Sequence, residues 1–226
     1  MDAFVVNRKI DWSLYAILDK RAIGTRDIRE LAEQIIAGGA GIIQLRDKIS
    51  PVKEFYEDSL AVKEITTQLG VPLIINDRVD IALAVKAEGV HLGQDDLPFD
   101  TARRLLGEQR MLGASVHSLE EYRAAQKGRP NYLGVGTIYS SNTKNGLKEK
   151  GCGLVQRLRS MTDLPIVGIG GITVDNLEPV LAAGADGVAV IAGLLDADNV
   201  YERATRFVAE VHRLSKSRQR QPTSQA

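Results

Sequence analysis

Eight short apolar runs recur along this chain, and amphipathic segments separate them. The runs cover residues 14–18, 41–45, 73–75, 89–92, 111–116, 132–138, 166–169 and 187–191, and they show little polar alternation. Strands buried on both faces have this texture, because helices cover both sides of a parallel sheet. Eight strand–helix units in 226 residues predict a closed (β/α)8 TIM barrel in a single α/β domain. An open doubly wound sheet uses similar units and is the alternative.

The segments between these runs carry apolar residues at helical spacing. In one of them Ile28, Leu31 and Ile35 fall on one face, and Gly38 follows as a stop signal. Such patterns predict helices over residues 25–37, 52–69, 79–87, 101–106, 118–126, 154–161, 174–183 and 199–214. We therefore expect a barrel domain over residues 13–214, an N-terminal arm over residues 1–12 and a disordered polar tail over residues 215–226.

The composition bears on partners and location. The 29 basic residues balance 29 acidic ones, so no net field attracts nucleic acid or an anionic membrane. No stretch approaches the roughly 20 apolar residues of a membrane span, and the chain begins without a signal-peptide pattern. A single cysteine, Cys152, excludes an intrachain disulfide and a cysteine-rich zinc site. We expect a cytoplasmic protein without nucleic-acid or membrane partners, and the sequence leaves a homo-oligomer open.

Polar residues follow the ends of most predicted strands. In a barrel the carboxyl ends of the strands share one rim, where residues far apart in sequence meet. Asp77 and Asp96 stand just beyond two successive strands, so their carboxylates can converge on one ion, and Mg²⁺ suits two carboxylates with waters and phosphate oxygens. Alternatively, Asp77 caps a helix and Asp96 belongs to a solvated turn. Asp95 is chemically as suitable as Asp96, and Asn76 beside Asp77 forms a common turn pair.

The end of the second predicted strand places cations on an inward-facing line. Alternation along a strand sends Gln44, Arg46 and Lys48 to one side. Burying two cations in an otherwise empty core would cost free energy. The pair suits a multiply charged anion, which Arg binds through two parallel N–H groups and Lys through its compact ammonium charge. The alternative is that both have left the barrel and pair with Asp47 or Glu54.

Two glycine-rich strand ends predict a phosphate site. Residues 168–172 (GIGGI) end the seventh strand, and residues 190–193 (VIAG) end the eighth. In (β/α)8 enzymes these loops often bind a phosphate through backbone N–H groups. The long loop YSSNTKNGLKEK has the composition of a phosphate-gripping lid, with Ser141, Thr143 and Lys144 as donors. A plain solvated loop is the alternative there.

The remaining reactive residues have structural explanations. His91 suits a hydrogen-bonded structural histidine better than an acid–base group, His117 lies beside a helix cap, and His212 belongs to the last helix. Cys152 begins a helix without an evident partner base, so we treat it as inert. The sequence therefore offers no activated protein nucleophile.

Several motifs together resemble the thiamine-phosphate synthase family. They are QLRDK at residues 44–48, IIND at 74–77, GVHLGQDD at 89–96, LGASVH at 112–117, SNTK at 141–144 and VGIGGI at 167–172. Their order and separation are similar to the family's over nearly the whole chain, which makes the set far more specific than one motif. The resemblance implies a transferase that joins hydroxymethylpyrimidine diphosphate to hydroxyethylthiazole phosphate, giving thiamine phosphate and diphosphate.

The resemblance also implies a metal and two anion sites. Mg²⁺ would be held by Asp77 and Asp96, which favours Asp96 over Asp95 by analogy. The pyrimidine ring would contact Gln44 and Ser115, and the diphosphate would be bound by Arg46, Lys48, Asn76 and Lys144. The thiazole phosphate would lie against Ser141, Thr143, Gly171, Ile191 and Ala192. The residues implied to be catalytic are Arg46, Lys48, Ser115 and Lys144.

One position departs from the family pattern. Family members usually have Val-Ser where this chain has Ile191 and Ala192. The serine hydroxyl is therefore missing, and we expect only a backbone N–H contact to the phosphate there.

The implied reaction requires no protein nucleophile. Cations around the departing diphosphate favour a dissociative displacement, in which the thiazole nitrogen traps a pyrimidine cation. A related thiazole tautomerase would not need the magnesium and diphosphate residues. A phospho-sugar isomerase or epimerase would require an acid–base pair that the sequence does not show. A non-catalytic binder of thiamine precursors would not need the complete set of catalytic residues.

Overall fold

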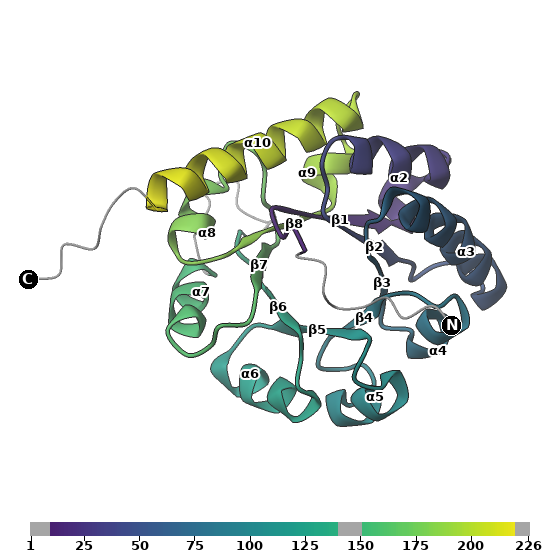
Figure 1. Ribbon diagram of the computed structural model, residues 1–226, viewed down its shortest axis with the longest axis horizontal. Helices are drawn as coiled ribbons and strands as arrows, with labels where there is room; N and C mark the ends of the chain where they lie inside the picture. Colours follow the sequence, from purple (N-terminus) through teal and green to yellow (C-terminus); the bar gives the residue numbers. More distant parts are fainter. Residues whose placement is uncertain (1–9, 140–150, 220–226) are drawn as a thin grey trace, which may run out of the picture.

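A computed structural model describes residues 10–139 and 151–219, and in it eight parallel strands close into a barrel. The strands follow one another in sequence order, and β8 pairs with β1 (Figure 1). Their bounds are β1 Leu14–Asp19, β2 Ile42–Arg46, β3 Leu73–Asn76, β4 Gly89–Leu92, β5 Met111–Val116, β6 Tyr132–Val135, β7 Ile166–Ile169 and β8 Gly187–Val190. Each predicted run overlaps one of these strands, and β1, β2 and β3 each extend one residue beyond the predicted run. The (β/α)8 barrel is confirmed, and the open sheet is wrong.

Helices surround the barrel on the outside (Figure 1). They are α1 Lys20–Ile23, α2 Ile28–Ala37, α3 Val52–Leu69, α4 Val79–Ala84, α5 Phe99–Leu106, α6 Leu119–Ala125, α7 Cys152–Arg159, α8 Glu178–Ala182, α9 Ala192–Leu195 and α10 Val200–Gln219, with a 3-10 turn η1 at Gln126–Gly128. The single-turn helices α1 and α9 were not predicted, because one turn is too short to show a helical period. No helix in the described ranges is both long and apolar enough to cross a membrane.

The last helix is longer than the sequence predicted. It continues past residue 214 to Gln219, so residues 215–219 belong to α10 and not to the predicted tail. The extension lacks an apolar period, but lysine, arginine and glutamine favour helix by intrinsic propensity.

Two apolar clusters stabilise the fold, one between barrel and helices and one inside the barrel. The outer cluster includes Ile43 and Leu45 of β2. The inner cluster consists of Tyr15, Ile17, Ile42, Ile74, Met111, Tyr132, Val167 and Ala189. Strand alternation causes this division, because successive side chains point to opposite faces. Gln44 and Arg46 follow Ile42 on the inward-facing side of β2, as predicted.

The segment before β1 closes the amino end of the barrel. Ile10 and Trp12 pack against the inner cluster, and the Trp12 and Tyr132 ring centroids are 5.0 Å apart. Gly187 leaves room for this segment, because a Cβ atom there would lie 1.8 Å from the Trp12 carbonyl oxygen. This packing leaves the carboxyl end of the barrel for a site.

Candidate active site at the carboxyl end of the barrel

Four of the residues predicted to bind the pyrimidine diphosphate line one cavity at the carboxyl end of the barrel. The cavity has a volume of about 140 Å³, and Gln44, Arg46, Asn76 and Ser115 form part of its walls. They come from β2, β3 and β5, whose ends the closed barrel brings together. Strand ends that are far apart in the sequence thus share one polar cavity.

Asp77 and Asp96 approach each other at the ends of β3 and β4. Asp77 has φ of 62°, and its backbone N–H donates to the His91 carbonyl oxygen at 2.9 Å. Asp96 lies in the loop after β4, where its carboxylate accepts from the Gly93 N–H at 2.6 Å. The Asp96 carboxyl lies close enough to Asp77 to raise the pKa of the Asp77 carboxyl group. Asp95 is exposed, so the structure separates two neighbours that the local sequence could not.

The two carboxyl groups form an electrostatic arrangement that favours a cation. Burial raises the pKa of Asp77, the Lys48 ammonium opposes this shift, and the adjacent Asp96 carboxyl adds to it. Lys48 forms an ion pair with Asp77. Among the residues that the structure describes, no third histidine, cysteine or acidic side chain completes a metal cluster. Two carboxylates with open positions fit Mg²⁺, which keeps several waters and accepts phosphate oxygens.

Arg46 is held by an acidic residue of the neighbouring strand. Its guanidinium pairs with one oxygen of Asp19 at the end of β1. The other oxygen of Asp19 accepts from the N–H groups of Arg21 and Ala22 and caps α1. The Arg46 side chain is 36% exposed, so it remains accessible at the rim.

The alternative partners that the sequence suggested for Arg46 and Lys48 are wrong. Asp47 accepts from two backbone N–H groups of its own turn, at 2.8 and 2.9 Å. Glu54 pairs with Lys20 at 3.0 Å. Both cations therefore lie beside rim carboxylates and have not turned away from the barrel.

A series of hydrogen bonds crosses the cavity from β2 to β5. Gln44 Nε2 donates to the Tyr15 hydroxyl at 2.7 Å, and the Tyr15 and Tyr132 hydroxyl oxygens are 2.7 Å apart. His91 links this pair to Ser115, with Nδ1 3.0 Å from the Tyr132 hydroxyl and Nε2 2.8 Å from Ser115 Oγ. Burial lowers the pKa of His91 to about 4, so its ring is neutral near pH 7. The prediction of a hydrogen-bonded structural histidine is confirmed.

Tyr15 and Tyr132 are cavity residues that the sequence analysis missed. Both line the cavity, and both are at most 1% exposed. The sequence did contain a signal for them, a tyrosine within each apolar run. A buried phenol hydroxyl needs a hydrogen-bond partner, so each tyrosine indicated a polar contact inside the barrel. Strand alternation alone did not show that the two hydroxyls would meet.

A second cavity, of about 570 Å³, adjoins the first at the ends of β7 and β8. Gly171, Ile191 and Ala192 line it, and Ile191 also lines the first cavity. Gly171 has φ of 64°, and a Cβ atom there would lie 2.8 Å from the Tyr139 carbonyl oxygen, so this turn requires glycine. Arg203 of α10 also lines the cavity. It was not predicted, because nothing in a surface-helix pattern distinguishes one arginine from another.

Three predicted phosphate ligands, Ser141, Thr143 and Lys144, lie outside the described residues. They lie between β6 and α7 in the sequence. Their roles remain predictions from the sequence.

The other histidines and the cysteine lie away from these cavities. His117 contacts Glu121 through Nδ1 at 3.0 Å, next to the Ser118 cap of α6, as predicted. His212 on α10 lies 3.5 Å from Asp11. Cys152 is half-buried at the start of α7.

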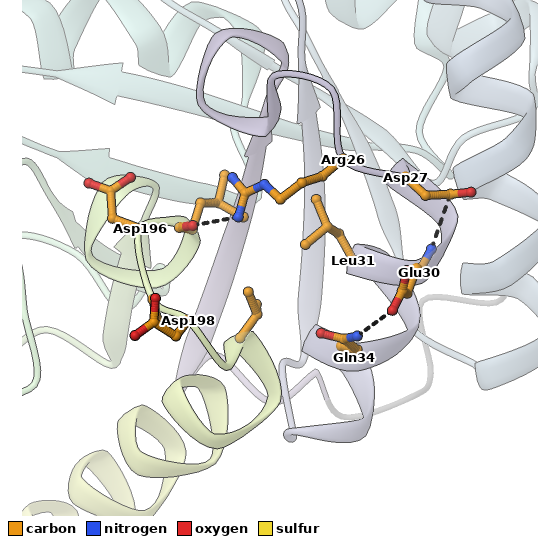
Figure 2. Close-up of a pocket in the computed structure, with 10 residues that line it drawn as sticks. Arg26, Asp27, Glu30, Leu31, Gln34, Asp196 and Asp198 are labelled. Atoms are coloured by element: carbon orange, nitrogen blue, oxygen red, sulfur yellow. Dashed lines mark hydrogen bonds between the residues drawn. The ribbon is translucent and has the colours of Figure 1, made fainter.

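A third cavity, of about 510 Å³, lies outside the barrel between α2 and the start of α10 (Figure 2). Arg26 donates there to the Leu195 carbonyl oxygen at 2.6 Å. Two acidic side chains are engaged locally, because Asp27 caps α2 and Glu30 accepts from Gln34 at 2.9 Å. None of the predicted site residues within the described ranges lines this cavity, so the chemistry is assigned to the two cavities at the rim.

Known proteins are similar to this chain in both fold and sequence. The family model for thiamine monophosphate synthase matches residues 14–194. The chain is 41% identical to the thiamine-phosphate synthase of Clostridium acetobutylicum over 197 residues, covering 87% of this chain and 93% of that protein. It is 42% identical to the thiamine-phosphate synthase of Caldanaerobacter subterraneus subsp. tengcongensis over 212 residues, covering 93% and 99%. The solved structure of thiamine phosphate pyrophosphorylase from Pyrococcus furiosus is similar with a TM-score of 0.80 and 32% identity, covering 90% of this chain and 97% of that one.

Proposed function

The chain belongs to the thiamine monophosphate synthase family, and we propose that it joins hydroxymethylpyrimidine diphosphate to hydroxyethylthiazole phosphate at the carboxyl end of its barrel. It is an enzyme, a transferase of thiamine biosynthesis that forms thiamine phosphate. Diphosphate is the leaving group, Mg²⁺ is the metal, and the enzyme works in the cytoplasm.

The approach of Asp77 to Asp96 is the observation that carries this proposal. Because Asp96 raises the pKa of the Asp77 carboxyl, a divalent cation held by both groups would stabilise their charged forms. Lys48 pairs with Asp77, and Arg46 lies at the end of the adjacent strand β2. A site of alternating cations and carboxylates suits a metal-bound diphosphate. A thiazole tautomerase releases no diphosphate, so this arrangement would serve no purpose in it.

The residues at the rim divide the binding of the first substrate. Arg46, Lys48 and Asn76 hold the diphosphate, with Lys144 of the following loop, while Gln44 and Ser115 hold the pyrimidine ring. Asp77 and Asp96 would hold Mg²⁺, which would neutralise charge on the diphosphate. Arg46 and Lys48 stabilise the same charge as it grows on the departing oxygen.

The displacement proceeds without a covalent enzyme intermediate. The bond between the pyrimidine methylene carbon and the diphosphate oxygen breaks, and its electron pair leaves with the diphosphate. The electron-rich aminopyrimidine ring stabilises the resulting carbon cation. The lone pair of the thiazole nitrogen then forms the new carbon–nitrogen bond. The barrel contributes chiefly by holding the two substrates in contact.

The second cavity holds the thiazole phosphate next to the first substrate. Gly171, Ile191 and Ala192 offer backbone N–H groups to it, and Ser141 and Thr143 add hydroxyls. Arg203 adds a positive charge to the wall of this cavity. Because Ile191 lines both cavities, the thiazole ring lies against the wall that the pyrimidine also contacts.

Product formation tests the proposal directly. The purified chain is incubated with both substrates and magnesium chloride, and thiamine phosphate and diphosphate are measured by mass spectrometry and a coupled phosphate assay. We expect equal amounts of both products, loss of activity with a chelator, and recovery on adding magnesium. The absence of thiamine phosphate would refute the proposed reaction. Full activity after metal removal would refute the metal site alone.

A further inference from the structure

We propose that Tyr15, Tyr132 and His91 form a one-way hydrogen-bond relay that fixes the Gln44 amide and makes the site select an aminopyrimidine over an oxopyrimidine. The specificity in this inference rests on the proposed function, because it concerns the ring that Gln44 and Ser115 bind. The relay itself is a property of the substrate-free protein.

The direction of the relay follows from its first donor. Gln44 Nε2 donates to the Tyr15 hydroxyl, and the amide nitrogen has no capacity to accept. Tyr15 has one hydroxyl proton, which it donates to Tyr132, 2.7 Å away. Tyr132 in turn donates its own proton to His91 Nδ1 at 3.0 Å.

The last step of the relay assigns the tautomer of His91. Because Nδ1 accepts from Tyr132, the neutral ring carries its proton on Nε2. Nε2 therefore donates to Ser115 Oγ at 2.8 Å. Ser115 then has its own hydroxyl proton available for a ligand in the cavity. His91 is unable to act as a base toward Ser115 in this arrangement, which agrees with a reaction that uses no serine nucleophile.

The packing around the relay leaves its side chains little contact with solvent. Gln44 is 3% exposed, Tyr15 1% and Tyr132 0%. Gly113 makes room for the central contact, because a Cβ atom there would lie 2.1 Å from Tyr132 Cζ and 2.5 Å from His91 Nδ1. Reversing the relay would require the Gln44 amide and every proton along it to change places together.

A fixed amide discriminates between two kinds of pyrimidine ring. An aminopyrimidine presents a ring nitrogen that accepts next to an amino group that donates. An oxopyrimidine presents the reverse pattern, a ring N–H that donates next to a carbonyl oxygen that accepts. A glutamine amide that could turn over would match either ring. With Nε2 held by Tyr15, the amide oxygen and its remaining N–H have fixed places, so only one pattern is satisfied.

The tautomer of His91 tests the relay without any substrate. Nuclear magnetic resonance of protein with isotopically labelled histidine distinguishes a proton on Nε2 from one on Nδ1, and His117→Gln and His212→Gln assign the remaining signals. We expect His91 in the wild-type chain to be a single neutral tautomer with the proton on Nε2. A proton on Nδ1 would overturn the relay.

Binding of two pyrimidine diphosphates tests the specificity. Calorimetry measures the dissociation constants of the amino compound and of its oxo counterpart for the wild type, Tyr15→Phe and Tyr122→Phe. Tyr122 is the matched control, because it is also buried and its hydroxyl accepts from Gln126 on the outer side of the barrel. We expect Tyr15→Phe to lower the preference for the amino compound by about tenfold, which corresponds to about 1.4 kcal/mol, because the freed amide can match either ring, while Tyr122→Phe leaves the preference unchanged.

The outcomes separate this inference from the proposed function. An unchanged preference in a folded Tyr15→Phe protein, or an equal loss in Tyr122→Phe, would refute the specificity. If Tyr15→Phe does not fold, Tyr132→Phe is measured in the same way, because it interrupts the relay at the next hydroxyl. Failure of the wild type to bind either compound would refute the proposed substrate, and the His91 tautomer would still decide the relay.

Discussion

Arg46 at the end of β2 pairs with Asp19 at the end of β1, and the same carboxylate caps α1. Asp19 therefore orients a cation of the active site from the strand next to it. We expect Asp19→Ala to lower kcat/KM for the pyrimidine diphosphate by about tenfold to a hundredfold, because a misplaced charged group loses much of its effect. Steady-state kinetics with each substrate varied in turn measures this change.

Asp27→Ala is the matched control for Asp19. Asp27 caps α2 through the same kind of side-chain contact but touches no active-site cation. Both substitutions remove a helix cap and should lower the free energy of unfolding by about 1 kcal/mol. Equal kinetic losses in the two variants would show that Asp19 acts only through helix stability.

Asp77→Ala and Asp96→Ala should each lower turnover by at least about a hundredfold, because each removes a proposed metal ligand and so weakens the neutralisation of charge on the departing diphosphate. The magnesium concentration that gives half-maximal activity should rise in both. Asp95→Ala is the control, because Asp95 is the exposed neighbour of Asp96. Unchanged magnesium dependence in the first two variants would remove the metal assignment.

The sequence predicted the barrel because its signal is repeated eight times. Each strand buried on both faces gave an apolar run, and the helices between them gave the helical period. It missed α1 and α9, which are single turns, and it ended α10 too early, because residues 215–219 carry helix propensity without an apolar stripe. A helical period of apolar residues becomes visible in a sequence only over several turns, so these short segments could not be recognised from it.

The site was predicted in part for a similar reason. Residues near the carboxyl end of a strand can be placed at the rim by counting, and Gln44, Arg46, Asn76 and Ser115 do line one cavity. Contacts between side chains of different strands could not be counted in this way. The Tyr15–Tyr132 contact joins β1 to β6 across the barrel, and the Asp19–Arg46 pair depends on the register between β1 and β2.

His91 should make stability depend on pH. Burial lowers its folded-state pKa to about 4 from an ordinary value of 6.5. Below pH 6.5 the unfolded chain takes up a proton that the folded chain does not. The stabilisation is therefore complete above pH 6.5 and declines as the pH falls toward 4, by up to about 1.4 kcal/mol per pH unit.

Urea unfolding between pH 7.5 and pH 4 measures this slope. His91→Gln should be less stable at neutral pH, because it breaks the buried hydrogen bonds, but its free energy of unfolding should fall less steeply with acid. His117→Gln serves as the control, since the His117 side chain is 54% exposed. Parallel curves for the wild type and His91→Gln would contradict the buried neutral histidine.

Ala192→Ser should improve binding of the thiazole phosphate. Ala192 is exposed at the start of α9 and lines the second cavity, so a hydroxyl group there has room to donate to the phosphate. A hydrogen bond to a charged group contributes about 1.5 kcal/mol or more, which corresponds to a KM about tenfold lower. The KM for the pyrimidine diphosphate should stay unchanged, because its proposed ligands among the described residues lie at or near the ends of β2 to β5. Ala197→Ser, which lines the third cavity, is the control for an added hydroxyl. If Ala192→Ser leaves the KM for the thiazole phosphate unchanged while that of the pyrimidine diphosphate shifts, the two substrates have been placed in the wrong cavities.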